Sequence, residues 1–404
     1  MEQTTTLKSA IREYARELLP RIINIRRHLH AHPELSFKEF NTAAFICDEL
    51  DAIGISYERM VETGIVALIK GKNPGKKTIA LRADLDALPI TEKSTAIYKS
   101  TNVGVMHACG HDVHSASLIG AAHILNNLRD QFEGTVKLIF QPGEEKAPGG
   151  ASLMIKAGVL ENPKPASIFA QHVFPSLPAG KAGFRSGMYM ASTDEIYLKL
   201  IGKAGHAAIP EDYVNPVLMA ATIVAALHAF FMDEKTRLRS AAEFPTVLAF
   251  GKIEGLGATN VIPDVVHVEG TFRTMNEEWR AKAHEFMKKT AEAMAKDMGG
   301  TCEFRIETGY PFLVNDVTVT NNARSAAEDY LGKENVVDLP QRMTAEDFAF
   351  YSQKIPACFY RLGTASPDGK FTAGVHTPVF DIDENALETG MGLLAWIALD
   401  ALIN

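Results

Sequence analysis

The sequence has few cysteines and no apolar run long enough to cross a membrane. Only 4 of its 404 residues are cysteine, and no two of them stand at C-x-x-C spacing, which argues against a disulfide framework or a zinc ribbon. The most apolar stretch, VLMAATIVAALHAFFM, is shorter than the roughly 20 residues of a membrane span and predicts a buried helix. The N-terminal stretch lacks the apolar core of a signal peptide. We therefore expect a cytoplasmic protein with no membrane partner.

The sequence also has fewer basic than acidic residues. Lysine and arginine total 41 against 49 aspartates and glutamates, a formal net charge of -8, so neither nucleic acid nor an anionic membrane is expected as a partner. Hydrophobic residues make up 46% and charged residues 22%, as in ordinary globular proteins. A chain of 404 residues exceeds the usual size of one domain, which predicts two domains.

The N-terminal half alternates extended and helical patterns. They predict strands at residues 64–71, 77–89 and 134–145, and helices at residues 43–54 and 112–131. Asp112 is the expected N-cap of the last of these helices. Apolar strands that alternate with helices predict an α/β fold with a largely parallel sheet. Ligands bind beyond the carboxyl ends of such strands, and polar residues end three apolar stretches, RADLDALP, FQPGEE and SIFAQHVFP.

The pattern changes from about residue 192. Strands and helices then follow in the order β-α-β-β-α-β, which predicts a ferredoxin-like unit. Helical segments around short strands return after it, so we expect this unit to be inserted in the larger domain. The predicted boundaries are 1–190 and 309–404 for the larger domain, and 191–308 for the inserted one.

The stretch MHACGHDVH places four potential metal ligands within eight positions: His107, Cys109, His111 and His114. A closed structural zinc site uses four protein ligands, usually with paired cysteines, and no such pair is present. A buried cysteine among core histidines is the alternative interpretation. The helix N-terminus after the cluster favours a thiolate at Cys109. Because four such groups lie at the mouth of an α/β sheet, we expect an open metal site here.

Two adjacent carboxylates, Glu144 and Glu145, follow a strand that should end at the same edge of the sheet. Their repulsion is costly unless a cation offsets it. One of them can ligate a metal while the other accepts a proton from water. A solvated surface turn would fit the same pattern.

Two aspartates and several single histidines complete the candidates in the larger domain. Asp84 and Asp86 occupy alternate positions at a strand end and share one face, so they can ligate metal or orient ligand histidines. Taken singly, His172 and His376 carry no metal signal. His28, His30 and His32 in RRHLHAHPELSF have no assured carboxylate partner, and we expect a structural role for them.

The inserted unit carries three candidate substrate contacts. His206 and Asn260 lie in Gly-rich loops, where an imidazole and an amide can stabilise an oxyanion or hold a carboxylate. Arg273 can bind a carboxylate in a forked geometry, and a surface arginine on a strand is the alternative.

Eight motifs occur in the order found in a known family: RRHLHAHPELSFKE, RADLDALPI, HACGHDVHSASLIGAA, FQPGEE, GKAGHAA, TNVIPD, MTAEDFAFY and HTPVFDIDENAL. Together they resemble the dinuclear-metal amidohydrolases, which include hippuricases, bacterial N-acyl-amino-acid deacylases and plant auxin-conjugate hydrolases. The resemblance spans nearly the whole chain.

The resemblance implies a metallopeptidase-like catalytic domain interrupted by a lid domain that also forms a homodimer. It implies that two divalent metals are bound by five ligands, Cys109, His111, Glu145, His172 and His376. Glu144 would be the general base, and His206 and Asn260 the lid residues that meet the substrate. His107 and His114 would not be ligands. We group Asp86 with Glu144 and His206 as catalytic, and Asp84 as a residue that orients ligands.

The expected activity is therefore metal-dependent hydrolysis of the amide bond of N-acyl amino acids, with manganese, zinc, cobalt or nickel. The acyl group would be of acetyl, benzoyl or indole-acetyl type. A dipeptidase, a carboxypeptidase or an aminobenzoyl-glutamate-type hydrolase could use the same site. A metal-loaded binding protein without turnover is the alternative of another class, but binding alone does not require a general base such as Glu144.

Overall fold

The computed structural model describes residues 2–232 and 244–403, which form two compact units. The larger unit comprises Met1–Tyr189, Val314–Pro340 and Asp347–Asn404. The smaller unit comprises Met190–Leu313 and Gln341–Glu346. The smaller unit therefore interrupts the larger one in the sequence.

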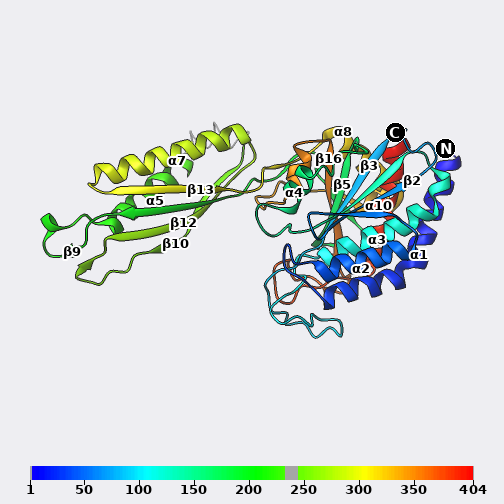
Figure 1. Ribbon diagram of the computed structural model, residues 1–404, viewed down its shortest axis with the longest axis horizontal. Coiled ribbons are helices and arrows are strands. Elements are labelled where there is room, and N and C mark those ends of the chain that lie inside the picture. The colour runs from blue at the N-terminus through cyan, green and yellow to red at the C-terminus, as the bar shows by residue number, and fades with distance from the viewer. Residues whose placement is uncertain (1, 233–243, 404) are drawn as a thin grey trace. The chain divides into compact units, whose positions relative to one another are not determined.

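A mixed eight-stranded sheet forms the centre of the larger unit (Figure 1). The strand order is β1-β2-β4-β3-β5-β16-β6-β15. The bounds are β1 Tyr57–Met60, β2 Gly64–Lys70, β3 Thr78–Asp84, β4 Thr135–Gln141, β5 Ile168–Pro178, β6 Ala182–Phe184, β15 Val336–Asp338 and β16 Ala357–Ala365. β3 pairs in parallel with β4 and with β5, so these strands end at one edge. The predicted α/β fold is confirmed, and the sheet is mixed rather than largely parallel, because β1–β2, β2–β4 and β16–β6 pair antiparallel.

Helices α1, α3 and α10 pack together against one face of this sheet (Figure 1). The helices of the larger unit are α1 Glu2–Ala31, α2 Phe40–Ala52, α3 His111–Asn127, α4 Gly150–Lys156, α8 Val317–Leu331, α9 Ala349–Ser352 and α10 Ala386–Ile403. Every residue of β3 is buried. Ile79, Leu81 and Ala83 join the helix-side core, and the intervening Arg82 lies on the opposite face because side chains alternate along a strand.

The apolar composition of α10 is explained by its place in this core. The expectation that no apolar stretch is long enough to cross a membrane is wrong for this helix, which could do so by length and composition alone. In the folded chain, 72% of its apolar window is buried, and it packs against α1, α3 and α8. Trp396 on this helix is only 1% exposed.

The smaller unit is a four-stranded antiparallel sheet with two helices on one face. Its elements are β8 Asp194–Ile201, α5 Pro216–Met232, β10 Thr246–Glu254, β12 Val265–Thr274, α7 Glu277–Asp297 and β13 Thr301–Thr308. The strand order β10-β12-β8-β13 is that of a ferredoxin-like unit, so this prediction is confirmed. Two short strands, β9 Gly205–His206 and β11 Val261–Ile262, pair separately. Two others, β7 Gly187–Met190 and β14 Leu313–Asn315, lie near the junctions in the sequence.

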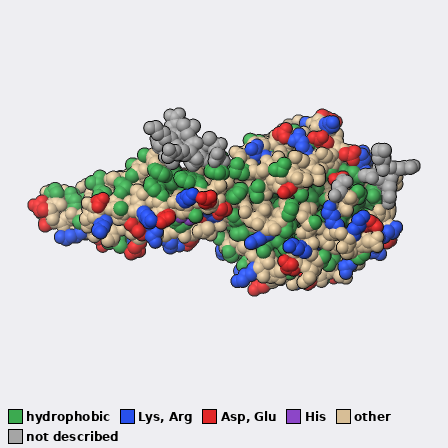
Figure 2. Space-filling view, turned by 90° about the horizontal axis from the view of Figure 1, so that it is seen from above, with side chains coloured by type: hydrophobic (Ala, Val, Ile, Leu, Met, Phe, Trp, Pro, Cys, Tyr) green, Lys and Arg blue, Asp and Glu red, His purple; other side chains and the backbone are tan. Residues whose placement is uncertain are grey.

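The prediction that α5 is a buried helix is wrong for one of its faces. Met219, Ile223 and Leu227 pack in the core of the unit, whereas Val217 and Leu218 are 45% and 57% exposed. A helix in a two-layer unit packs against its sheet on one side only. The space-filling view shows hydrophobic side chains among the charged ones on the visible surface (Figure 2).

The prediction that Asp112 caps α3 is also wrong. The helix begins at His111, and the N-cap is Gly110 with a φ of 80°. The Asp112 carboxylate instead accepts hydrogen bonds from Arg26 Nε at 2.7 Å and His30 Nδ1 at 2.8 Å. A buried guanidinium is a stronger partner for a carboxylate than a backbone N–H group.

A buried ion pair joins β8 to α7 in the smaller unit. Asp194 is fully buried and accepts hydrogen bonds from Arg280 Nε at 2.9 Å and from Arg280 Nη2 at 2.5 Å. His284 Nε2 lies 2.7 Å from the same carboxylate. Removing one partner of such a pair leaves an uncompensated buried charge.

We predict that Arg280→Met destabilises the smaller unit by about 3–5 kcal/mol, because the Asp194 carboxylate loses its main partner in a buried place. Urea unfolding of the full chain measures this change. Lys282→Met on the same helix is the matched control, since Lys282 forms an exposed pair with Glu278 and exposed pairs contribute little. Equal unfolding midpoints for the two variants would contradict the prediction.

Candidate metal centre

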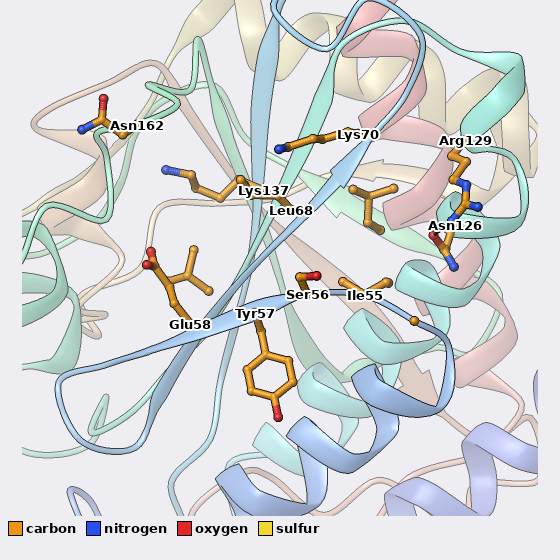
Figure 3. A pocket seen from close by; sticks show the side chains of 13 residues that line it. Ile55, Ser56, Tyr57, Glu58, Leu68, Lys70, Asn126, Arg129, Lys137 and Asn162 are labelled. Carbon is orange, nitrogen blue, oxygen red and sulfur yellow. Dashed lines mark hydrogen bonds between the residues drawn. The ribbon is translucent and has the colours of Figure 1, made fainter.

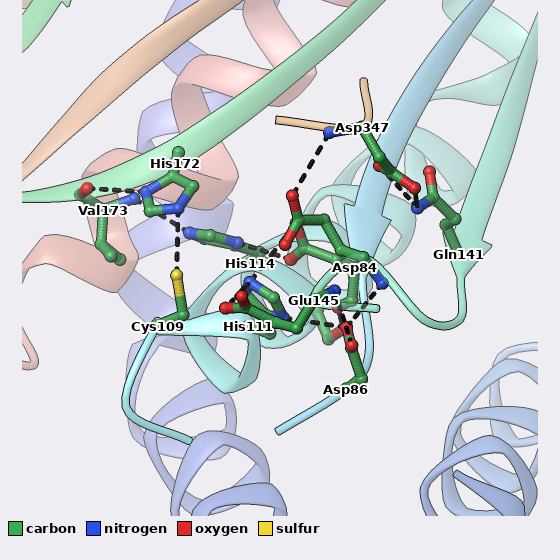
Figure 4. Close-up of polar contacts among 12 residues, drawn as sticks. Asp84, Asp86, Cys109, His111, His114, Gln141, Glu145, His172, Val173 and Asp347 are labelled. Carbon is green, nitrogen blue, oxygen red and sulfur yellow. Dashed lines mark hydrogen bonds and ion pairs between the residues drawn. The ribbon is translucent and has the colours of Figure 1, made fainter. Parts of the chain in front are cut away.

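Polar side chains from three neighbouring strands meet at the carboxyl edge of the large sheet (Figure 4). Asp84 ends β3 and Asp86 follows it, the turn at residues 143–145 follows β4, and His172 lies in β5. Because β4, β3 and β5 are adjacent and parallel, these groups reach the same edge.

Cys109 belongs to two groups of potential ligand atoms. It forms one group with His111 and His172 and another with Glu145 and His376, and the atoms of each group lie within 4.8 Å of one another. Its Sγ atom is 3.4 Å from His172 Nε2 and 3.3 Å from His376 Nε2. The structure thus brings together the five residues that the resemblance implies as ligands, and Cys109 is common to both groups.

Hydrogen bonds determine which ring nitrogen of two histidines is available. His111 Nδ1 lies 3.2 Å from Asp86 Oδ1, and His172 Nδ1 donates to the carbonyl oxygen of Val173 at 2.8 Å. These two contacts use the Nδ1 atoms and leave the Nε2 atoms of both rings to the cluster. Metal-ligating histidines commonly hold their other nitrogen in this way.

The cluster contains buried polar atoms that the protein does not satisfy. Among the residues described, His111 Nε2 and Glu145 Oε1 are buried without a hydrogen-bond partner. Glu145 Oε1 lies 3.9 Å from His111 Nε2 and 3.3 Å from His376 Nε2. Unsatisfied buried groups are costly, and a cation held by these atoms would remove the cost.

The pKa values of the cluster also fit a metal. Burial, with the Glu145 carboxylate nearby, raises the pKa of the Cys109 thiol well above its usual value. Burial would lower the pKa of His111, but the carboxylates of Asp84 and Asp86 outweigh it and raise this pKa to about 10. Without a cation, a proton on His111 balances the carboxylates. A divalent cation would replace that proton and stabilise the thiolate.

His114 is occupied on both nitrogens and cannot serve as a ligand in this arrangement. Its Nδ1 atom lies 2.6 Å from Asp84 Oδ1, and its Nε2 atom accepts a hydrogen bond from the backbone N–H of Val173 at 2.9 Å. Asp84 also accepts from the buried Arg82 at 2.5 Å. Asp84 therefore orients His114, which in turn binds the backbone of β5 at the residue after His172.

Glu144 lies beside the ligand groups. It is 7% exposed, and its Oε1 atom accepts a hydrogen bond from the backbone N–H of Asp347 at 3.3 Å. It forms a third group with His111 and Glu145 but shares no group with Cys109 in the described chain. A carboxylate next to a metal site, rather than central in it, is placed to accept a proton.

The structure places the remaining candidates in the smaller unit. β9 and β11 pair His206 with Val261, directly after Asn260, so these two predicted residues come together. His206 is exposed. Arg273 lies in the other sheet, on β12, and its Nη1 atom donates to the carbonyl oxygen of Met343 at 3.3 Å.

Sequence reasoning missed three residues that support the centre. Ser36 Oγ donates to Asp86 at 2.6 Å, Glu39 accepts from the backbone N–H of Gly143 at 2.8 Å, and Asp347 contacts Glu144 as described above. Their motifs, PELSFKE and MTAEDFAFY, were part of the family resemblance. The signal was present in the motifs, but the partners of these residues depend on the tertiary fold.

A separate cavity of about 510 Å³ is lined by residues of β1, β2 and the end of α3 (Figure 3). Lys137 Nζ is already bound to the carbonyl oxygens of Val159 and Glu161, at 2.8 and 2.7 Å. Arg129 Nη1 lies 3.2 Å from Asn126 Oδ1, and it is on the opposite side of the cavity from Lys137 (Figure 3). These cationic groups do not converge on a ligand position.

Residues 80–400 match the model of Peptidase family M20/M25/M40. The chain belongs to this family. The resemblance noted in the sequence is confirmed, and the family relationship makes the protein a hydrolase.

Relatives with several different activities match nearly the whole chain. N-acetylcysteine deacetylase of Bacillus subtilis is 40% identical over 384 residues, which cover 95% of this chain and 97% of the relative. IAA-amino acid hydrolase ILR1-like 5 of Arabidopsis thaliana is 37% identical, with 95% and 87% covered. Thermostable carboxypeptidase 2 of Saccharolobus solfataricus is 34% identical, with 97% and 98% covered.

A solved structure of a relative has the same fold. The YXEP protein of Bacillus subtilis, described as a dinuclear metal binding peptidase from the M20 family, is 37% identical. It superposes with a TM-score of 0.82 and covers 96% of this chain and 99% of its own.

We predict that metal-free protein gains stability when Mn²⁺ or Zn²⁺ is added. A cation at 100 times its dissociation constant stabilises the folded state by about 2.7 kcal/mol, which thermal unfolding detects. Cys109→Ala should lose most of this gain, because both ligand groups contain Cys109. Cys302→Ala in the smaller unit is the control and should keep it. An equal gain in Cys109→Ala and the unaltered chain would rule out the shared ligand.

Proposed function

We propose that this protein is a metal-dependent amidohydrolase that cleaves N-acyl amino acids to a carboxylate and a free amino acid. The observation that carries the proposal is that two potential ligand groups share Cys109, with the Glu144 carboxylate beside them. The deacetylase and the IAA-amino acid hydrolase, at 40% and 37% identity, support this substrate class. Acyl groups of acetyl, benzoyl or indole-acetyl type are the candidates.

The proposed ligands are Cys109, His111, Glu145, His172 and His376, for two divalent cations among manganese, zinc, cobalt and nickel. When bound, such cations lower the pKa of water and polarise an amide carbonyl. The rings of His111 and His172 are pre-oriented for this role by the partners of their Nδ1 atoms. Softer thiolate and imidazole donors together with a carboxylate suit these transition metals.

Glu144 is the proposed general base. Its carboxylate would accept a proton from the attacking water and return it to the leaving amine. The Asp347 N–H group at 3.3 Å orients this carboxylate. We assign Asp86 a positioning role rather than proton transfer, because its two oxygens already accept four hydrogen bonds.

Residues of the smaller unit would complete the reaction. The His206 imidazole is proposed to stabilise the oxyanion of the tetrahedral intermediate. Asn260, which stands next to it across the β9–β11 pair, and Arg273 are proposed to hold the carboxylate of the amino acid.

Peptide hydrolysis is the second candidate, and the observation that favours it is the 34% identity to a thermostable carboxypeptidase. A dipeptide or an aminobenzoyl-glutamate-type amide presents the same scissile bond and the same terminal carboxylate. The two classes therefore differ in the acyl pocket and not in the proposed chemistry.

We predict that Glu144→Gln lowers kcat by a factor of about 10² to 10⁴, because general acid–base catalysis contributes that much, while metal content stays unchanged. Initial rates on acetyl, benzoyl and indole-acetyl amino acids and on dipeptides are measured after chelation and after each metal is restored. Glu161→Gln, at an exposed carboxylate of the same unit, is the control.

The outcomes separate the candidates. Near-normal turnover by Glu144→Gln would exclude its role as the base. Cleavage of dipeptides alone would move the assignment to a peptidase. Metal binding without hydrolysis of any member of the panel would support the binding-protein alternative.

We also propose that the smaller unit forms a homodimer, as the family resemblance implies. The outer face of α5 exposes Val217, Leu218 and Met232, and the edge strand β10 exposes Val247 and Ile253. Exposed apolar faces and open sheet edges favour association. A second copy related by a two-fold axis would present the same surface and cover both the outer face of α5 and the edge of β10.

We predict that Leu218→Glu converts this dimer to a monomer, because it places a charge in the apolar face. Light scattering after size-exclusion chromatography measures the mass. Lys282→Glu on α7, where the lysine side chain is 65% exposed, should leave the mass unchanged. A monomeric unaltered protein would overturn this proposal.

A further inference from the structure

The segment at residues 34–39 runs beside the strand end that carries the acidic residues. Leu35 forms a parallel bridge with Ala87, and the Ala87 N–H group donates to the Glu34 carbonyl oxygen at 2.8 Å. This segment follows α1 and precedes α2. It therefore lies next to the candidate metal centre without contributing a ligand.

Ser36 connects this segment to the turn that carries Glu144 and Glu145. Its Oγ atom donates to Asp86 Oδ2 at 2.6 Å. The same carboxylate accepts from the backbone N–H groups of Glu144 at 3.1 Å and Glu145 at 3.0 Å. A change in the position of Asp86 would thus be transmitted to both residues of the turn.

Glu39 contacts the first residue of the turn directly. Its side chain is fully buried, and its Oε1 atom accepts from the backbone N–H groups of Gly143 at 2.8 Å and Phe37 at 2.9 Å. Its Oε2 atom accepts from Thr63 Oγ1 at 2.8 Å. The carboxylate joins the turn, its own segment and the end of the β1–β2 connection.

The contact between Phe37 and Gly143 shows how closely these two segments approach. A Cβ atom at position 143 would lie 2.4 Å from the Phe37 ring. Phe37 itself has a φ of 63°, which is rare for a bulky residue and is retained only where the surroundings require it. The hydrogen bonds of Glu39 to both backbones hold this close approach in place.

We propose that Ser36 and Glu39 are positioning residues that set the place of the turn at 143–145, and through it the place of Glu144. The proposal rests on the proposed function only in taking Glu144 as the proton acceptor. The turn is irregular, so its N–H groups depend on side-chain acceptors. Glu39 provides one, and Asp86, held by Ser36, provides the other two.

The role of Glu39 is to accept hydrogen bonds rather than to carry charge. Glu39→Gln keeps one oxygen for Gly143 and Phe37, and its amide can donate to the Thr63 hydroxyl. Glu39→Ala removes every acceptor. The alanine variant should therefore release the turn, and the glutamine variant should retain it.

The test measures hydrogen exchange of the peptide at 142–146 in metal-free protein, together with kcat and KM on a substrate that the unaltered protein hydrolyses. Glu39→Ala should accelerate exchange of this peptide at least tenfold and lower kcat at least tenfold, with KM within twofold. Glu39→Gln should remain within about threefold of the unaltered protein in both. Ser36→Ala should accelerate exchange and lower kcat at least threefold.

Glu34→Ala is the matched control. Glu34 accepts from the backbone N–H groups of Asn41 and Thr42 at the start of α2, so only that region should exchange faster and kcat should stay unchanged. Ser36→Ala decides the matter if Glu39→Ala does not fold. Unchanged exchange at 142–146 in Ser36→Ala and in any folded Glu39→Ala would overturn the proposal. Faster exchange with no hydrolysis by the unaltered protein would instead leave the positioning intact and refute the proposed function.

Discussion

The candidate metal centre depends on the hydrogen bonds that Asp86 accepts. Its carboxylate is 1% exposed and accepts from Ser36, from His111, and from the backbones of Glu144 and Glu145. These donors come from three segments that are distant in the sequence. Without this acceptor, four polar groups would lose their hydrogen-bond partner in a largely buried place, which would lower the stability of the folded state. The geometry of the ligands thus relies on a carboxylate that belongs to neither of the ligand groups around Cys109.

Charge in the centre is arranged in two layers. Behind the ligands, Arg82 joins Asp84 at 2.5 Å to Asp347 at 2.8 Å, so these buried carboxylates are paired within the protein. In front, the described ion pairs of Glu145 are with the histidines His111 and His376, which carry charge only when protonated, and not with lysine or arginine. The protein therefore neutralises the supporting carboxylates with Arg82, and it leaves the negative charge of the ligand layer to be balanced by bound cations.

The sequence could predict the strand ends but not the contacts that support them. RADLDALP and FQPGEE are apolar runs that end in carboxylates, and parallel strands bring such ends together. Asp112 was misjudged because its partner Arg26 lies 86 positions away. Glu39 was missed for the same reason, since 104 positions separate it from Gly143. The prediction that α5 is fully buried rested on its apolar composition alone, although the predicted ferredoxin-like unit has two layers and therefore covers only one face of a helix.

The two groups that share Cys109 also have a consequence for chain connectivity. His376 and Cys109 are 267 positions apart, and the whole smaller unit lies between them in the sequence. A cation held by both residues would act as a reversible cross-link that closes this long loop at its base. Closing a long loop removes conformational freedom mainly from the unfolded chain. Metal loading would accordingly tie the early and late parts of the larger unit together even while the inserted unit unfolds.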